Sequence, residues 1–356
     1  LYENVIMKKL IQVFFLFVCL CVSAQDGTPY KVYLIGDAGE DTTAGKALLL
    51  LKEELLSNPN SSVVFLGDNV YPSGLKKDSK ESVLHLESQL QILKEYKGNV
   101  FFIPGNHDWE AQKRNGLSIL KNQEIYVEDY LKKNSTVANK EKTTFLPKGG
   151  LPGPETVMLN DKLRLIIIDT QWFLHFYKKN TIDSKKETKV LFYKRLDSLL
   201  AFAKINEEQV IIAAHHPIYS NGQHGRRKQP FRFVINCTPL QLFGLLGLNR
   251  LYSQDLSGLR YRRMRKKMLS SFNKYDNIVY ASGHEHNLQC FKNKGTRFIV
   301  SGSGSKRSHL MKRKRFDSAF QDDKTTGFIK LEYVNKNYKS TTIYRVGENA
   351  FILEGY

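Results

Sequence analysis

Five short blocks of the sequence place side chains that can bind metal ions just after predicted strands. The blocks are Gly36-Asp37-Ala38-Gly39, Gly67-Asp68-Asn69-Val70-Tyr71, Gly105-Asn106-His107-Asp108, Ala214-His215-His216-Pro217 and Gly283-His284-Glu285-His286. One such block alone is often only a turn or a helix cap. Five blocks in series, each with Asp, Asn or His at a strand end, indicate that all five contribute to the same metal-binding site. Oxygen and imidazole donors without thiolates suit iron, zinc or manganese and disfavour a structural zinc site.

Asp68 is the candidate for a ligand shared between two ions. Two multivalent cations held close together repel strongly, so a carboxylate is needed to bridge and neutralise them. A glycine before a ligand, as in Gly67-Asp68, lets the backbone turn sharply and lets the ions approach the strand ends. The blocks therefore predict a site that holds two metal ions.

Alternating strands and helices are predicted to position these blocks. Strands are expected near residues 31–35, 63–66, 100–103, 163–168, 209–213 and 277–281, and three more near 297–301, 327–333 and 340–345. Helical composition covers residues 43–56 and 80–96. This alternation predicts a layered α/β domain.

Two stretches are predicted to be insertions into this framework, at about residues 118–153 and 229–257. The first is polar and ends in a Gly/Pro-rich segment. The second contains an apolar run, residues 239–248, framed by basic stretches. That run is either a lid beside the site or, as is commoner for apolar runs of this length, a helical hairpin packed on the main body.

The N-terminus has the pattern of a signal peptide. Lys8 and Lys9 precede an apolar run over residues 10–22, and small residues follow before Gln25. We therefore expect residues 1–24 to direct export to the periplasm, the cell envelope or the medium, with an uncleaved anchor as the alternative. Residues 1–6, ahead of Met7, could lie outside the natural precursor. The remaining 25–356 are long enough, in a chain with 41% hydrophobic residues, to form one large domain.

An exported protein could pair Cys237 with Cys290, although two unpaired thiols are an equally good interpretation. The net charge of +19 is concentrated in clusters at residues 226–228, 260–267 and 306–315 and favours anionic partners. Phosphorylated substrates and an anionic envelope surface both fit, as do merely solvated faces. The chain contains no nucleic-acid reading motif, which disfavours nucleic acid as a partner.

In this order the blocks resemble those of the calcineurin-like metallophosphoesterases and, more narrowly, the purple acid phosphatases. The more specific resemblance to the purple acid phosphatases rests on Tyr71, three residues after Asp68, and on the absence of a histidine from the first block. Resemblance to the small tartrate-resistant form also includes the stretch 283–289, Asp169 in Ile168-Asp169-Thr170, and His224. It spans about residues 30–345.

Two single-residue departures accompany the insertions. Glu285 stands where the family typically has Asp, and Ala214 where a glycine is usual. These departures affect the expected substrate selectivity more than the expected metal binding.

The resemblance implies a four-layer sandwich of two mixed β-sheets flanked by helices. It also implies one iron bound by Asp37, Tyr71 and His286, a second metal bound by Asn106, His215 and His284, and Asp68 between them. The metals would be Fe(III) with Fe(II), Zn(II) or Mn(II). His107 and His224 would face the phosphate and protonate the leaving group, and Asp108 would hold His107 in position. His216 is not expected to be a ligand.

The predicted activity is hydrolysis of phosphate monoesters, of small molecules or phosphoproteins, by attack of a metal-bound hydroxide and without a phosphoenzyme. A phosphodiesterase or nucleotidase of the same superfamily is the first alternative. The second alternative is a non-catalytic scaffold attached to the envelope. The complete set of expected ligands argues against this alternative, because a site that has lost its activity usually loses ligands first.

Overall fold

A computed structural model describes residues 28–134, 144–175, 185–225, 256–334 and 337–356. The expected signal peptide, the basic cluster 226–228, Cys237 and almost all of the expected insertion 229–257 lie outside the described residues. Within the described part of the chain, no helix is long and apolar enough to cross a membrane.

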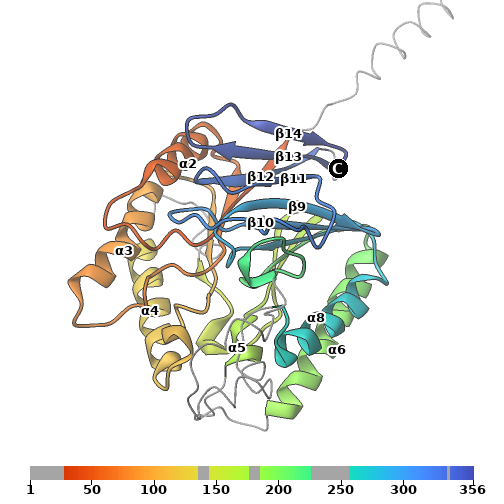
Figure 1. Ribbon diagram of the computed structural model, residues 1–356, viewed down its shortest axis with the longest axis horizontal. Coiled ribbons are helices and arrows are strands. Elements are labelled where there is room, and N and C mark those ends of the chain that lie inside the picture. Colours follow the sequence, from red (N-terminus) through yellow and green to blue (C-terminus); the bar gives the residue numbers. More distant parts are fainter. Residues whose placement is uncertain (1–27, 135–143, 176–184, 226–255, 335–336) are drawn as a thin grey trace, which may run out of the picture.

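The described residues form two mixed β-sheets of seven strands each (Figure 1). The strands of the first sheet are β1 (Tyr30–Ile35), β2 (Ser61–Phe65), β3 (Asn99–Phe102), β4 (Thr144–Phe145), β12 (Gly327–Val334), β13 (Asn337–Arg345) and β14 (Phe351–Glu354). Their spatial order is β14-β13-β12-β1-β2-β3-β4, parallel from β1 to β4 and antiparallel from β1 to β14.

The second sheet repeats this plan. Its strands are β5 (Glu155–Asn160), β6 (Leu163–Ile167), β7 (Gln209–Ala213), β8 (Ile278–Ser282), β9 (Leu288–Asn293), β10 (Thr296–Ser301) and β11 (Phe320–Asp322). Their order is β11-β9-β10-β8-β7-β6-β5, parallel from β10 to β6 and antiparallel at both margins.

Helices cover the outer face of each sheet, so the expected sandwich of two mixed sheets flanked by helices is confirmed (Figure 1). On the first sheet lie α2 (Lys46–Ser57), α3 (Lys80–Leu90) and α4 (Gly116–Asn134). On the second lie α5 (Gln171–Leu174), α6 (Lys185–Ile205) and α8 (Leu259–Phe272).

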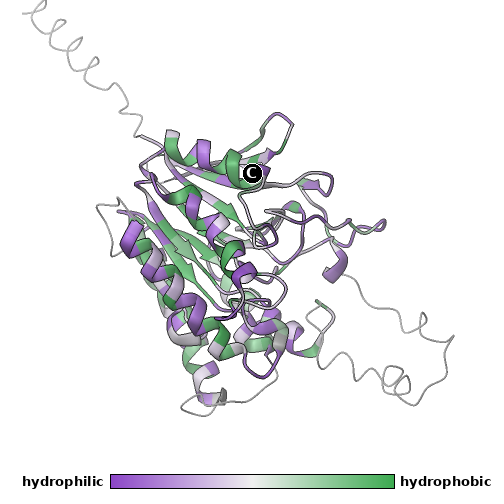
Figure 2. Ribbon diagram, turned by 90° about the vertical axis from the view of Figure 1, so that its left-hand side faces the viewer, coloured by the Kyte–Doolittle hydropathy of each residue, from purple (hydrophilic) through white to green (hydrophobic). Residues whose placement is uncertain are grey.

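Alternate side chains of the central strands pack into two different layers. In β1, Val32 and Leu34 belong to a cluster built from both sheets without any helix residue, whereas Tyr33 and Ile35 pack with the helices. Strands buried on both faces become continuous apolar runs, which is why they are recognisable from sequence. Figure 2 shows these hydrophobic strands beside helices that alternate hydrophobic and hydrophilic residues.

All the expected strands are present, and the strands that were not expected are β4, β5, β9, β11 and β14. The stretch 118–153, expected to be an insertion, contains most of α4 and the strand β4, which pairs with β3. Leu120, Val127 and Leu131 of α4 are buried in the core, so this helix is part of the layer on the first sheet. Cys290 in β9 is a buried free thiol between the sheets, and its possible partner Cys237 lies outside the described residues.

Candidate metal centre

The two sheets present the carboxyl ends of five parallel strands at one place. Asp37 follows β1, Asp68 follows β2 and Asn106 follows β3, while His215 and His284 follow β7 and β8 of the other sheet. Backbone hydrogen bonds join the loops, from Asp37 N to the Gly67 carbonyl (3.0 Å) and from Gly283 N to the His215 carbonyl (3.0 Å). The predicted ligands from both halves of the chain therefore meet in one buried site.

Three of these residues have a left-handed backbone conformation. The φ angles are 57° at Asp37, 54° at Asp68 and 69° at His284. A non-glycine residue in this region costs on the order of 1–3 kcal/mol and persists only where the surroundings enforce it. Here the strain turns each functional side chain out of its strand and into the site.

Close approach of the loops explains two of the glycines before ligands. A Cβ on Gly67, which has a φ of +88°, would lie 2.6 Å from Gly105 N and 2.9 Å from the His215 ring. A Cβ on Gly105 would lie 2.2 Å from an Asp68 carboxylate oxygen. Any side chain at either position would push the two strand ends apart.

Tyr71 is the centre of the first group of candidate ligand atoms. Its hydroxyl lies 3.0 Å from Asp37 Oδ1, 3.2 Å from Asp68 Oδ2 and 3.1 Å from His286 Nε2. Burial, together with the two carboxylates, raises the pKa of Tyr71 well above its ordinary value, so without a cation the phenol keeps its proton. A multivalent cation in this position would take the place of that proton, and the donor set fits one.

Asn106, His215 and His284 form the second group. The Asn106 amide oxygen lies 3.0 Å from His215 Nε2 and 2.9 Å from His284 Nδ1, and these two nitrogens are 3.3 Å apart. His215 directs its other nitrogen, Nδ1, to the Leu66 carbonyl at 2.8 Å, which leaves Nε2 for the site. Buried nitrogen and oxygen atoms that converge so closely also fit a shared cation.

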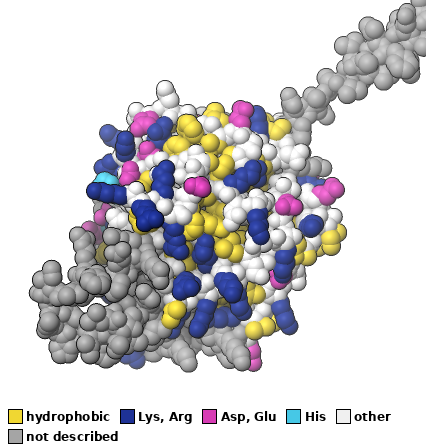
Figure 3. Space-filling view, turned by 45° about the vertical axis from the view of Figure 1, so that its right-hand side comes forward, with side chains coloured by type: hydrophobic (Ala, Val, Ile, Leu, Met, Phe, Trp, Pro, Cys, Tyr) yellow, Lys and Arg dark blue, Asp and Glu magenta, His cyan; other side chains and the backbone are white. Residues whose placement is uncertain are grey.

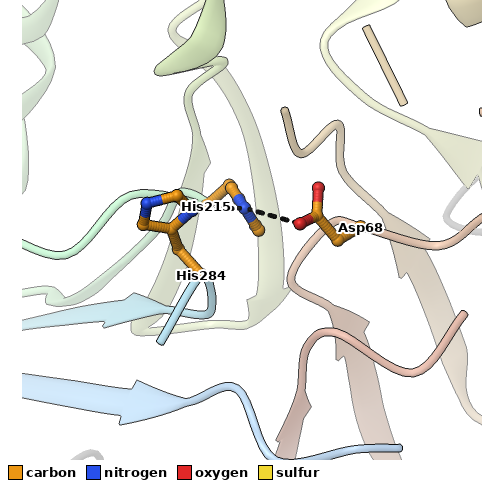
Figure 4. A group of neighbouring side chains, drawn as sticks. All are labelled: Asp68, His215 and His284. Carbon is orange, nitrogen blue, oxygen red and sulfur yellow. Dashed lines mark hydrogen bonds and ion pairs between the residues drawn. The ribbon is translucent and has the colours of Figure 1, made fainter. Parts of the chain in front are cut away.

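Asp68 contacts both groups through the same oxygen. Its Oδ1 accepts a hydrogen bond from His107 N (2.8 Å), while Oδ2 faces Tyr71 in the first group and lies 3.4 Å from His215 Nε2 in the second. Figure 4 shows this carboxylate opposite the two histidines from the other sheet. Ligand atoms of Asp68, His215 and His284 all lie within 4.8 Å of one another.

His107 lies at the edge of the site. Its Nδ1 is 2.6 Å from the Pro72 carbonyl, and its Nε2 is 3.8 Å from Asp68 Oδ2. Since a carbonyl only accepts, Nδ1 carries a hydrogen and Nε2 is the nitrogen directed at the site. The side chain is 28% exposed, so a substrate can reach it.

The expected support of His107 by Asp108 is wrong. Asp108 Oδ1 accepts from Asn69 N (3.0 Å) and Gln123 Nε2 (2.9 Å), and Oδ2 accepts from Asn69 Nδ2 (3.0 Å) and Gly105 N (2.7 Å). The carboxylate therefore joins the second and third blocks to α4. The Asp108 side chain is fully buried and bonds to these groups, and none of these bonds involves the His107 ring.

His224 reaches the site from a short turn, and Glu285 supports that turn. The His224 ring lies 4.4 Å from the His284 ring, centroid to centroid. Glu285 is buried and accepts hydrogen bonds from Ser220 Oγ (2.7 Å) and Gly225 N (3.1 Å) through one oxygen. In the sequence, Glu285 was noted only because the family typically has Asp at this position. The longer side chain of Glu suits the distance to the turn that carries His224.

Lys306 lies beside the site, a position that sequence reasoning did not separate from its basic cluster. Its ammonium lies 3.7 Å from the centroid of the Tyr71 ring and 2.5 Å from Glu40 Oε2. Its loop is fixed to the site by bonds from Ser305 N to the Asp37 carbonyl (3.1 Å) and from Ser308 N to the His286 carbonyl (2.7 Å). A cation is thereby held beside the first group of ligands.

Two further residues near the site, Asp169 and His216, form hydrogen bonds with neighbouring protein groups. Asp169 accepts from the Trp109 indole (2.8 Å) and from Trp172 N (3.0 Å), and burial raises the pKa of its carboxyl to about 7. His216 is buried with its Nδ1 2.9 Å from Thr170 Oγ1, so it belongs to neither group of ligands.

Comparisons with known proteins agree with this geometry. Residues 30–288 match the family described as calcineurin-like phosphoesterase. No curated protein matches the sequence. Among solved structures, the chain is similar to GAP50, described as the anchor in the inner membrane complex of Plasmodium, with 18% identity, a TM-score of 0.55, and coverage of 92% of this chain and 89% of that one. It is also similar to a dimetal phosphatase from Danio rerio, with 13% identity, a TM-score of 0.51, and coverage of 92% of this chain and 99% of that one.

Proposed function

The chain belongs to the calcineurin-like phosphoesterase family, and from that premise we propose that it hydrolyses phosphate monoesters at a two-metal site of the purple acid phosphatase type. The observation that carries the proposal is the position of the Tyr71 hydroxyl, within 3.2 Å of Asp37, Asp68 and His286. A phenol at the centre of one metal group suits ferric iron, because a hard phenolate ligand stabilises a trivalent ion.

The two groups define what each metal would contact. Asp37, Tyr71 and His286 would hold Fe(III), while Asn106, His215 and His284 would hold Fe(II), Zn(II) or Mn(II), with Asp68 between them. When bound, such a pair lowers the pKa of a water molecule and neutralises charge on the phosphate. The chain itself then has to place the ester and supply a proton to the departing oxygen.

His107 Nε2 is the proposed proton donor. Its partner nitrogen is fixed by the Pro72 carbonyl, so the ring presents Nε2 to the site in a single orientation. His224, whose ring centroid lies 4.4 Å from that of His284, is proposed to bind phosphate oxygens. Lys306 adds positive charge where an anionic substrate would enter.

Export, and a phosphorylated small molecule or phosphoprotein as substrate, complete the proposal. The basic N-terminal start with its apolar run supports export. The surplus of Lys and Arg supports an anionic substrate, because a positive field raises its local concentration.

The experiment combines metal analysis, an absorption spectrum and two substrates. We expect two metal ions per chain, a visible charge-transfer band after iron loading, and faster turnover of an aryl monoester than of the matching diester. Tyr71→Phe should keep both metals and lose the band, whereas the matched control Tyr275→Phe, remote from the ligands, should keep it. A colourless iron-loaded protein would exclude the purple acid phosphatase type, faster diester turnover would favour a phosphodiesterase, and an inactive protein without metals would favour a scaffold.

A further inference from the structure

The outer face of α8 is cationic over residues 262–267. The helix buries Tyr261, Met264 and Met268 on its inner side. The solvent side carries Arg262, Arg263, Lys266 and Lys267, which are all exposed. The spacing i, i+1, i+4, i+5 puts these four cations on one stripe of the helix.

The outer face of α6 exposes large apolar side chains among cations. Val190 and Leu191 are 47% and 64% exposed, and Lys194 and Arg195 follow them on the same stripe. Nearer the end of the helix, Ile205 is 81% exposed. A helix that only faces water normally keeps such a stripe polar, so this face has the composition of a contact surface.

The two stripes belong to one surface. The Lys267 ammonium lies 5.0 Å from the Tyr193 ring centroid, and Lys274 pairs with Asp197 at 3.1 Å, so α8 and its C-terminal end lie alongside α6. Burial, and then the charges of Arg260, Lys267 and Arg263, lower the pKa of Lys189 in α6. Lys189 thus lies in the positive field of α8.

The two helices together carry more than half of the net charge of the chain. The sequences of α6 and α8 contain 12 Lys and Arg and 2 Asp and Glu, a surplus of 12 − 2 = 10, against +19 for the whole protein. In the view that brings this side forward, Lys and Arg gather on the lower half of the described surface, with apolar side chains between them (Figure 3).

We propose that the face formed by Val190, Leu191 and Lys194 of α6 with Arg262, Arg263 and Lys266 of α8 docks on a bilayer of anionic phospholipid. Cations attract the negative leaflet, and the exposed apolar side chains enter the boundary between headgroups and acyl chains. Each half of the face supplies one of the two interactions that stable peripheral binding needs.

The pairing of charge with aliphatic side chains selects this partner over others. Nucleic acid binding favours exposed aromatic rings on which bases can stack, whereas the exposed apolar residues of the proposed face, Val190 and Leu191, are aliphatic. Of the aromatic rings of α6, Tyr193 lies under Lys267 and Phe202 lies under Arg164. A second copy would bring an equally cationic face against this one, and like charges would repel. An anionic bilayer satisfies the charge and the apolar stripe together.

The docking face is firmly attached to the body that carries the metal centre. On its inner side, Tyr261 donates to the Pro217 carbonyl at 2.5 Å and Arg265 donates to the Ile218 carbonyl at 2.6 Å. Both carbonyls lie within three residues of His215. Binding through α8 would therefore hold the active site near the membrane, although the inference does not depend on the proposed activity.

The test measures co-sedimentation of the purified chain with vesicles. Vesicles of phosphatidylcholine alone are compared with vesicles containing 30% phosphatidylserine. We expect binding only to the anionic vesicles and weakening as salt rises. The variant Arg262→Gln, Arg263→Gln, Lys266→Gln should lower the partition coefficient about a hundredfold, since each cation near such a leaflet contributes about fivefold.

Two matched variants separate the proposal from general charge. Lys77→Gln, Lys94→Gln, Lys97→Gln removes the same charge from exposed positions on the side of the first sheet and should change binding less than threefold, a rough bound that follows from screening over this distance. Val190→Ser, Leu191→Ser should lower binding about tenfold through lost apolar burial, with the salt dependence unchanged. All variants should keep the wild-type thermal unfolding transition, which shows that they fold whether or not the protein has the proposed activity.

Several results would overturn the inference. They are the absence of binding to anionic vesicles, equal losses for the two charge variants, or unchanged binding of the Val190, Leu191 variant. Binding of a single-stranded homopolymer as tight as that of vesicles, lost in the same variants, would assign the face to nucleic acid instead. Self-association abolished by Val190→Ser, Leu191→Ser would assign it to a second copy.

Discussion

At the scale of single residues, one backbone contact orients the ring of His107, the proposed proton donor. The Pro72 carbonyl takes the Nδ1 hydrogen at 2.6 Å, so any proton delivered to a substrate has to leave from Nε2. That nitrogen is 3.8 Å from the Asp68 carboxylate, at the edge of the site. This orientation fits the proposed role of His107 as a proton donor.

A proton donor matters most when the leaving group is poor. We expect His107→Ala to keep both metals and to lose activity on alkyl phosphates about a hundredfold more than on nitrophenyl phosphate, because general acid catalysis is worth about 10²–10⁴-fold. Steady-state kinetics with metal quantification measures this difference. His309→Ala, at a histidine whose side chain is 91% exposed, is the control. Equal losses on both substrates would assign His107 to phosphate binding, and loss of a metal would make it a ligand.

Lys306 is proposed to attract the phosphate of an incoming ester. Its ammonium lies above the Tyr71 ring and pairs with Glu40, so the charge is partly neutralised but fixed in place. We expect Lys306→Gln to raise KM and the inhibition constant of inorganic phosphate about tenfold, in proportion to one partly screened charge contact, with a small change in kcat. Lys312→Gln, at an exposed position of the same segment, should leave both constants unchanged. A fall in kcat with KM unchanged would contradict a role in substrate attraction.

At the scale of elements, buried side chains fasten the strand-end turns to one another. Asp108 joins the turn after β2, the turn after β3 and helix α4 through four hydrogen bonds. Glu285 does the same for the turn that carries His224. The strained backbone at the ligands depends on such bonds, because the turns themselves are short.

We expect Asp108→Asn to destabilise the protein and loosen the second metal. The amide nitrogen cannot accept hydrogen bonds, so two of the four donors lose their acceptor, at a cost of about 2–4 kcal/mol in the free energy of unfolding. Occupancy by the metal held next to Gly105 should fall as well. Denaturant unfolding and metal analysis measure both effects, with Asp161→Asn, at an exposed turn, as the control. Unchanged stability would show that Asp108 does not hold these turns together.

At the scale of the whole molecule, the metal-free site carries protons that a metal has to displace. Burial opposes the charged form of His215, but the attraction of Asp68 and the hydrogen bond between them outweigh burial and raise the pKa of His215 to about 9. Burial also raises the pKa of Asp37. Both groups hold protons in the folded, metal-free protein that they would release on unfolding.

Stability should therefore respond to pH in opposite ways with and without metal. For His215, whose folded pKa is raised, the stabilisation is fully present below the unfolded value of about 6.5 and is lost as pH rises through about 9. Metal affinity instead rises with pH over the same window, because the ligand has to be deprotonated. We expect the difference in Tm between zinc-loaded and chelator-treated protein to widen from pH 6.5 to 9, as measured by calorimetry. A difference that stays constant or narrows would contradict this linkage.

The ligand candidates could be recognised from the sequence because each is local to a strand end. A strand buried on both faces is an apolar run, and the polar residue directly after it has to lie at the carboxyl edge of a parallel sheet. The blocks that contain Asp37, Asp68, Asn106, His215 and His284 were predicted from this rule, whereas the choice of the residues other than Asp68 within the blocks came from the family resemblance. The structure brings the five residues to one site. Edge strands such as β4 and β11 escaped prediction, since a strand of two or three residues has no periodicity to read.

The sequence by itself determined which residue types are available at the strand ends, whereas the stacking of the two sheets decided which of them touch. Nothing local says that Asp108 turns toward Asn69 and not toward its neighbour His107, or that Lys306 lies over Tyr71. The same is true of the α6–α8 face, whose apolar and cationic stripes come from separate helices. Such contacts join segments distant in the chain, so they depend on the packing of whole layers and have no signature in any short stretch of sequence.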